Sequence, residues 1–118
     1  MINNYKKLEV WDKGQELVVS VYQLTRKLPK DERFGLVSQM RRCAVSIPSN
    51  IAEGKMRSSD TEFRRFLLIA LGSGAELETQ IDLSKKLFGL KSRDTANVEI
   101  LLEEVMKMLN TFIKKLES

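Results

Sequence analysis

The sequence predicts an all-α protein, an antiparallel up-down-up-down four-helix bundle that forms a single domain over residues 1–118. Apolar residues recur at steps of three and four in four successive segments, which is the spacing of a buried helix face. No segment alternates apolar and polar residues as a half-buried strand would. Short connections join the segments, so consecutive helices are expected to run antiparallel. A chain of 118 residues is also of the size expected for one domain.

The first predicted helix lies near the N-terminus. Its apolar positions recur at steps of three, four and seven, at Leu8, Trp11, Val18, Val21, Leu24 and Thr25. Proline cannot continue a helix and restricts the residue before it, so Pro29 predicts that this helix ends near Lys27.

The second predicted helix contains a proline. Its apolar face consists of Leu36, Met40, Cys43, Ile47 and Ile51. Asp31 is placed to cap its N-terminus, and the helix is expected to end between Gly54 and Arg57. Pro48 has no amide hydrogen, and its ring crowds the preceding turn. We therefore expect this helix to be kinked at Pro48.

The third predicted helix has the most regular pattern in the chain. Ser59-Asp60-Thr61-Glu62 predicts a capping box at its start, and Gly89 is expected to end it. Its stripe alternates steps of three and four through Phe63, Leu67, Ala70, Gly74, Leu77, Ile81, Ser84 and Phe88. Such a stripe is typical of the seam of a helical bundle.

The fourth predicted helix can be capped by Ser92 or Asp94. Its predicted inner face consists of Val98, Leu101, Val105, Met108, Phe112 and Leu116. Most of its charged side chains fall on the opposite face, as in an amphipathic helix.

Residues of the second and third helices whose numbers sum to about 118 should lie opposite each other in an antiparallel hairpin. Ala44 would then face Gly74, and the glycines would allow close backbone approach beside the kink. Arg42 would face Glu76, while Glu53 would face Arg64 and Arg65 as ion-pair partners. The residues expected at the kink and helix contact are Pro48, Ser49, Asn50, Gly72, Ser73, Gly74 and Glu76.

The third helix is also apolar outside its main stripe, at Phe66, Leu68, Ile69 and Leu71. One bundle interior cannot cover both faces. Because contiguous exposed apolar patches usually mark contacts, we expect a second buried surface, most simply an oligomer interface.

The net charge is +4, and the basic excess lies in the first half of the chain. Residues 1–58 carry 11 basic and 6 acidic side chains, whereas residues 59–118 carry 9 and 10. The candidate nucleic-acid-binding residues are Arg41, Arg42, Lys55, Arg57, Arg64 and Arg65. Arg26, Lys27, Lys30 and Arg33 are expected at the opposite end of the bundle.

Such cations can bind phosphates, although a charged helix face is most often only solvated. We see no aromatic platform interleaved with the candidate arginines, so we expect contacts to backbone phosphates and not to stacked bases or sequence reading.

Several function classes are disfavoured by composition. The chain has no histidine and one cysteine, Cys43, so disulfides within the chain and His/Cys zinc sites are not expected. No catalytic residues are predicted, because neither a nucleophile–base pair nor a phosphate-binding glycine loop is evident. We expect no cofactor, no metal and no membrane partner. The absence of a signal-like segment predicts a cytoplasmic protein.

Three segments resemble a known family. Leu8 followed by Trp11, the stretch RKLPKDERFGLVSQMRRCAVSIPSNIAEG and the stretch EFRRFLLIALGSGAELETQI are similar to the four-helix-bundle 23S rRNA intervening-sequence proteins. The resemblance spans roughly residues 8–90 and is carried mainly by Ser46 to Gly54 together with Gly72, Ser73 and Glu76.

The resemblance implies a small bacterial protein of largely undefined role. Some family members are encoded inside an insertion in the large-subunit ribosomal RNA gene. A related branch, the accessory variability proteins of diversity-generating retroelements, forms a pentameric barrel that binds nucleic acid and a reverse transcriptase. By that similarity we expect a homopentamer. The modest net charge and acidic fourth helix depart from the most basic members of that branch.

Two functional hypotheses follow. The first is a non-enzymatic oligomer that binds RNA or other nucleic acid through backbone phosphates. The alternative is an oligomeric scaffold that presents a helical surface to a protein partner.

Overall fold

The computed structural model describes residues 4–117 and contains four long α-helices. These are α1 (Glu9–Thr25), α2 (Leu36–Lys55), α3 (Asp60–Phe88) and α4 (Ser92–Lys115), with short 3-10 helices η1 (Asn4–Lys7) and η2 (Lys30–Glu32). The predicted all-α four-helix bundle is confirmed, and no strand occurs between residues 4 and 117.

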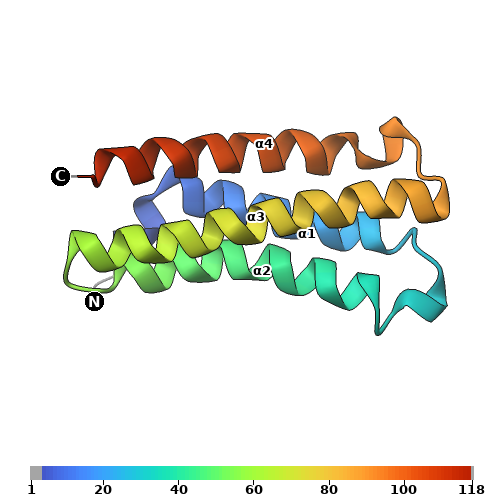
Figure 1. Cartoon of the computed structure of the whole chain (residues 1–118), viewed down its shortest axis with the longest axis horizontal. Coiled ribbons are helices and arrows are strands. Elements are labelled where there is room, and N and C mark those ends of the chain that lie inside the picture. The colour runs from blue at the N-terminus through green and yellow to red at the C-terminus, as the bar shows by residue number, and fades with distance from the viewer. Residues whose placement is uncertain (1–3, 118) are drawn as a thin grey trace.

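The bundle is a rod of 44 × 26 × 19 Å. In Figure 1 each helix returns along the one before it. The α1–α2 and α3–α4 connections therefore lie at one end of the rod. The α2–α3 turn lies at the other end, together with both ends of the described chain. None of the helices built from residues 4–117 is long and apolar enough to cross a membrane.

The core is formed by one face of each helix. The predicted face of α2 is buried throughout, and that of α3 is buried except for the half-buried Phe88. In α1 and α4 the buried face is rotated from the predicted one. Val10 and Leu17 are buried where Trp11 and Val18 were expected, and Leu102 and Leu109 where Leu101 and Met108 were expected. Apolar residues occupy neighbouring positions in these helices, so spacing alone does not select the face.

The helix ends follow local chemistry. The backbone N–H of Glu62 donates to Ser59 Oγ over 3.1 Å, which confirms Ser59 as the N-cap of α3. Gly89 ends α3 with φ of +65°, a left-handed conformation that glycine adopts without strain. The predicted cap at Asp31 is wrong, because Asp31 lies in η2 and the Glu32 carboxylate accepts the Leu36 N–H over 3.1 Å.

The predicted N-cap of α4 at Ser92 or Asp94 is wrong, because Lys91 is the N-cap and Asp94 takes part in a capping box from within the helix. Asp94 is the third residue of the helix, and its carboxylate accepts the backbone N–H of Lys91 over 2.8 Å. This contact satisfies a donor that has no partner within the helix and places negative charge at the positive end of its dipole.

Pro48 is buried, and α2 continues through it as one helix from Leu36 to Lys55. The kink at this residue stays a prediction. The proline ring packs against α1, where a β-carbon added to Gly14 would lie 3.4 Å from Pro48 Cβ. The missing side chain of Gly14 therefore lets α1 lie close to the proline.

The expected close approach of Gly72 and Gly74 to α2 is wrong. A β-carbon at Gly72 would meet nothing within 4 Å, and one at Gly74 would lie 3.1 Å from Met106 Cγ of α4. The close approach of α2 and α3 lies instead at Gly54, near the α2–α3 turn, where an added β-carbon would lie 2.5 Å from Phe66 Cβ.

Candidate nucleic-acid interface

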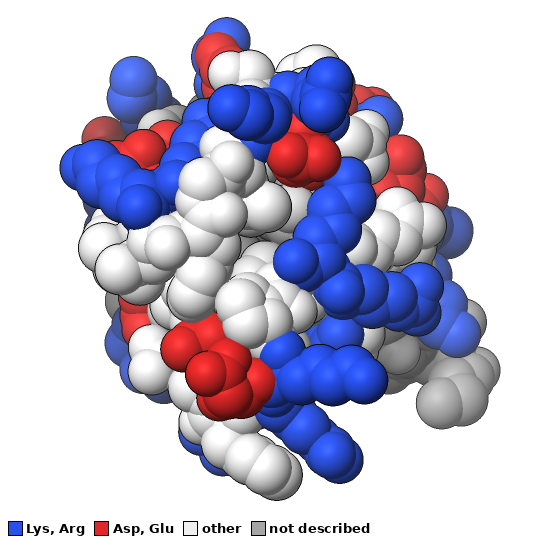
Figure 2. Space-filling model, turned by 90° about the vertical axis from the view of Figure 1, so that its right-hand side faces the viewer, with Lys and Arg blue, Asp and Glu red and all other residues white. Residues whose placement is uncertain are grey.

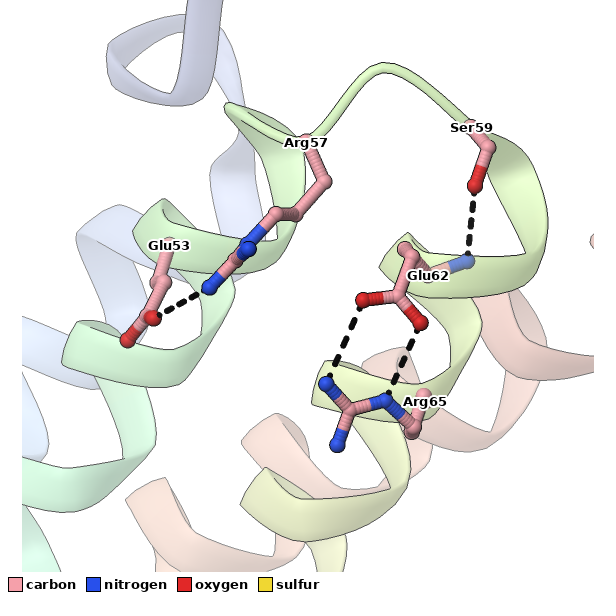
Figure 3. A network of polar contacts seen from close by, with 5 residues as sticks. All are labelled: Glu53, Arg57, Ser59, Glu62 and Arg65. Carbon is pink, nitrogen blue, oxygen red and sulfur yellow. Dashed lines mark hydrogen bonds and ion pairs between the residues drawn. The ribbon is translucent and has the colours of Figure 1, made fainter.

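The α2–α3 turn brings Arg57 and Arg65 close together, but each is paired with a carboxylate (Figure 3). Arg57 Nη2 lies 2.9 Å from Glu53 Oε2, and Arg65 donates to both carboxylate oxygens of Glu62 over 3.1 and 3.2 Å. Glu62 and Arg65 are three apart on α3, the spacing at which helix side chains meet, and Arg57 follows Glu53 of α2 by four residues from the turn just after the helix. The hydrogen bond from Arg65 lowers the pKa of Glu62. The charge at this turn is therefore largely compensated locally.

Phe66 lies beneath the same two arginines. The guanidinium carbons of Arg57 and Arg65 lie 5.0 and 4.7 Å from the centroid of its ring, within the range of cation–π attraction. Phe66 is 6% exposed, so the two side chains cover a residue that sequence analysis assigned to a second buried surface.

The other two candidates near this end also have partners. Arg64 Nη2 lies 3.0 Å from Glu117 Oε1 of the C-terminal segment, and Lys55 Nζ lies 5.4 Å from the Phe63 ring centroid. The expected pairing of Glu53 with Arg64 and Arg65 across the helices is wrong, because Glu53 pairs with Arg57 of the α2–α3 turn.

Arg41 and Arg42 lie apart from this group, in the first half of α2. Arg41 Nε donates to Thr25 Oγ1 over 2.9 Å, and its guanidinium carbon lies 4.3 Å from the Tyr22 ring centroid. Arg42 is exposed, and the expected ion pair between Arg42 and Glu76 is not present within residues 4–117. The six candidate cations therefore form two separate groups.

The surface around Arg41 and Arg42 is hollowed. An open hollow of about 560 Å³, which we call the arginine hollow, is lined by residues that include Tyr22, Arg33, Phe34, Arg41 and Arg42. Arg33 and Arg41 also line a second hollow of about 350 Å³ with Arg26 and Lys30. No carboxylate lines either hollow.

The aromatic residues of the arginine hollow were missed by sequence analysis. The view that no aromatic accompanies the candidate arginines is wrong, because Arg41 stacks on Tyr22 of the neighbouring helix α1 and the Phe66 ring lies beneath Arg57 and Arg65. Phe34 lies before the start of α2, so helical spacing does not place it beside Arg41, and only the structure brings both into the lining of the arginine hollow. Figure 2 shows the end of the rod near these residues, where Lys and Arg side chains outnumber carboxylates around uncharged atoms.

The polar residues expected beside Pro48 form a structural contact between α2 and α3. Ser46 Oγ and Ser73 Oγ lie 2.9 Å apart, and Asn50 Nδ2 donates to the carbonyl and the hydroxyl oxygen of Ser46 over 2.8 and 2.9 Å. Ser49 is exposed. The Ser46–Ser73 contact is compatible with the antiparallel register expected from the sequence.

Glu76 and Gln80 of α3 lie near the one thiol of the chain. Gln80 Nε2 lies 3.5 Å from Cys43 Sγ, and Cys43 is 8% exposed. Burial raises the pKa of Cys43 to about 11, and a hydrogen bond with Glu76 adds to the rise. The thiol is therefore protonated at neutral pH and has the properties of a core residue.

A third hollow lies between α3 and α4, and its lining is mainly acidic. It has a volume of about 680 Å³, and its lining includes Glu78, Asp82, Glu99 and Glu103. Within residues 4–117, however, no three His, Cys, Asp or Glu side chains are arranged to hold a metal ion. This acidic surface does not favour a nucleic-acid contact.

Comparison with known proteins gives one family. A family described as 23S rRNA-intervening sequence protein matches residues 6–111. A crystal structure of a protein of unknown function from the S23 ribosomal protein family of Bacteroides thetaiotaomicron is similar, with a TM-score of 0.79 and 26% sequence identity. The similarity covers 89% of this chain and 98% of that one. No curated protein matches the sequence significantly.

Proposed function

This chain belongs to the 23S rRNA-intervening sequence protein family, and on that premise we propose that it is a non-enzymatic, cytoplasmic bacterial protein that binds nucleic acid through backbone phosphates as a homo-oligomer. RNA is the first candidate ligand. We propose a homopentamer as the assembly, by similarity to the accessory variability proteins of diversity-generating retroelements.

The observation that carries the nucleic-acid proposal is the set of cations without carboxylate partners near Arg41 and Arg42. Within residues 4–117, neither arginine takes part in an ion pair, and the arginine hollow has no carboxylate in its lining. An uncompensated cation attracts phosphate more strongly than one that must first release a carboxylate. Arg57, Arg64 and Arg65 are paired and would therefore contribute less.

The oligomer proposal is supported by apolar side chains that the single chain leaves uncovered. Leu68 and Ile69 on α3 are 42% and 41% exposed, and Val45 on α2 is 41% exposed. Burial of such residues against copies of the chain would remove apolar surface from water. Five copies of a chain with a net charge of +4 would carry about +20, which would strengthen phosphate attraction.

The alternative is an oligomeric scaffold that binds a protein partner. The same exposed apolar residues favour it, because they could contact another protein. The two functions differ in their dependence on charge. Replacing Arg41 and Arg42 with glutamine should strongly weaken nucleic-acid binding and leave capture of a protein partner intact.

The deciding experiment combines mass and nucleic-acid content. Purified protein is passed through size exclusion with light scattering, and the ratio of absorbance at 260 and 280 nm is recorded at low and high salt. An oligomer carrying nucleic acid that salt removes would support the proposal, because phosphate contacts weaken steeply with salt. A monomer free of nucleic acid would contradict the proposed oligomer. An oligomer free of nucleic acid would favour the protein-binding scaffold.

RNA binding itself is measured by fluorescence anisotropy with the Arg41→Gln/Arg42→Gln double variant. We expect the double variant to bind short RNA far more weakly than the parent protein. The Arg57→Gln/Arg65→Gln double variant removes the same charge at the other end and should bind nearly as well as the parent. Equal loss in both would contradict a specific role for Arg41 and Arg42.

A further inference from the structure

Phe34 is an aromatic side chain that the described chain leaves uncovered. It lies between η2 and α2 and is 87% exposed, the largest value among the exposed large apolar residues of the described chain. Arg33 Cζ lies 5.2 Å from the centroid of its ring, so a cation and an aromatic face are presented together. A ring in this position has no role in the core.

The cations beside Phe34 are uncompensated. Five basic side chains line the two adjoining hollows: Arg26, Lys30, Arg33, Arg41 and Arg42. Within residues 4–117 none of the five forms an ion pair, whereas nearby Lys27 pairs with Asp94 over 3.3 Å. The Glu32 carboxylate is held by the backbone N–H of Leu36 at the start of α2.

The combination of arginines and aromatic rings selects among nucleic acids. Arginines can hold phosphates of any strand, but an aromatic ring can stack only on a base that is not already stacked inside a duplex. Single-stranded segments offer such bases. The volume of the arginine hollow, about 560 Å³, lies within the range of about 300–1,000 Å³ found for small-ligand sites.

We infer that the arginine hollow binds a single-stranded segment of nucleic acid, with one base stacked on Phe34 and adjacent phosphates held by Arg33, Arg41 and Arg42. This inference rests on the proposed function and adds to it a strand type and a base contact. Tyr22, which lies under Arg41 at 4.3 Å, helps to hold that guanidinium in place at the hollow.

The test measures anisotropy with three fluorescent probes, a short oligouridylate, an oligothymidylate of equal length and an RNA duplex. Phe34→Ala should weaken binding to the single strands about tenfold, the loss expected for one base–aromatic stack. Its effect on the duplex should be small. Phe34→Trp keeps an aromatic face and should bind as the parent does, with tryptophan fluorescence that single strands quench.

The salt dependence of the binding affinity distinguishes base stacking on Phe34 from phosphate contacts of the arginines. In a plot of log affinity against log salt concentration, Arg42→Gln should reduce the magnitude of the slope by about 0.7, the value for one phosphate contact on a single strand. Phe34→Ala should leave the slope unchanged. The control Ile100→Ala removes an apolar residue of α4 that is 59% exposed, and it should change neither affinity nor slope.

The results distinguish failure of the stacking inference from failure of the proposed nucleic-acid-binding function. If the parent protein binds RNA and Phe34→Ala binds single strands equally well, the stacking inference is wrong and the proposed function stands. If the parent binds none of the three probes at low salt, the proposed function fails and the inference with it. A preference for oligouridylate over oligothymidylate, or equal binding of both, agrees with the inference, since both present stackable bases.

Discussion

Gly54 of α2 and Phe66 of α3 meet at a distance that leaves no room for a side chain on α2. A β-carbon at Gly54 would lie 2.5 Å from Phe66 Cβ and 3.1 Å from Phe63 Cδ1. The two helices therefore approach closely near the turn that joins them. Phe66 also lies beneath Arg57 and Arg65, so one residue is shared by the packing of this turn and by its arginines.

Gly54→Ala should destabilise the protein by about 1–2 kcal/mol, because overpacking a core typically costs more than the helix propensity gained by alanine. Urea unfolding followed by circular dichroism measures the change. Gly72→Ala is the matched control, since a β-carbon there meets nothing within 4 Å. It should stabilise α3 by about 0.5–1 kcal/mol. Stabilisation by both substitutions would contradict the close approach at Gly54.

The hydroxyl contact between Ser46 and Ser73 should be measurable as a coupling between α2 and α3. Ser46→Ala and Ser73→Ala should each cost about 1 kcal/mol, because each removes the half-buried contact between the two hydroxyls. The double variant should cost less than the sum of the single ones. Ser49→Ala alters an exposed serine of the same helix and should change stability little. Strict additivity would show that the hydroxyls do not interact in solution.

The thiol of Cys43 should react slowly in the folded protein. Burial raises its pKa from an ordinary value of 9.0 to about 11, so at neutral pH the reactive thiolate is scarce. Labelling with a thiol-reactive disulfide should be slow under native conditions and fast in urea. Fast native labelling would contradict the burial.

The raised pKa of Cys43 also predicts a pH dependence. The unfolded thiol loses its proton first as pH rises, so its contribution to stability is complete below about pH 9 and is lost as pH approaches 11. Cys43→Ala lacks this contribution. The difference in unfolding free energy between the parent and this variant should therefore shrink across that window.

Asp94 should stabilise the start of α4 only while it is ionised. The hydrogen bond from the Lys91 N–H, and then that from Lys27, lowers the pKa of Asp94 below its ordinary value of 3.8. Its stabilisation is therefore present above that value and is lost as pH falls through the lower folded pKa. Asp94→Asn should unfold at a lower temperature at neutral pH, and the difference should vanish in strong acid. A difference that persists there would point to a cause other than charge.

Leu68 and Ile69 should govern assembly if copies of the chain associate through α3. Leu68→Gln/Ile69→Gln replaces two partly exposed apolar side chains and should yield folded monomer by light scattering. Leu87→Gln is the control, because it changes a side chain of the same helix that is 64% exposed and lies near the other end of the rod. If the double variant keeps the parent mass, the interface lies elsewhere.

The fold could be predicted from the sequence where the spacing of apolar residues matches the face that the helix buries. The stripe of α3 from Phe63 to Ser84 is buried as predicted, and the Ser59 cap and the Gly89 terminus act through their own local chemistry. The faces of α1 and α4 were less well predicted. Leu101 and Leu102 are equally apolar, and only the position of the neighbouring helices decides which of them is buried.

The candidate site was predicted less completely. The arginines were identified by residue type, but their partners depend on rotamers and helix ends, so Glu53 pairs with Arg57 and not with α3. Gly72 and Gly74 were correctly placed on a helix but wrongly assigned to the contact with α2. Residues two apart on a helix point in different directions, so Gly74 faces Met106 of α4 and Gly72 faces open space. Phe34 could be recognised as a candidate binding residue only once the structure showed that its side chain is exposed.

The arrangement of the chain ends has a practical consequence for surface methods. Both ends of the described chain lie beside the α2–α3 turn, and the arginine hollow lies toward the other end of a rod 44 Å long (Figure 1). A sensor chip or bead that captures the protein through either end would attach it beside the α2–α3 turn, at the end of the rod opposite the α1–α2 connection. Immobilisation at the chain ends should therefore leave the hollow accessible to a passing strand.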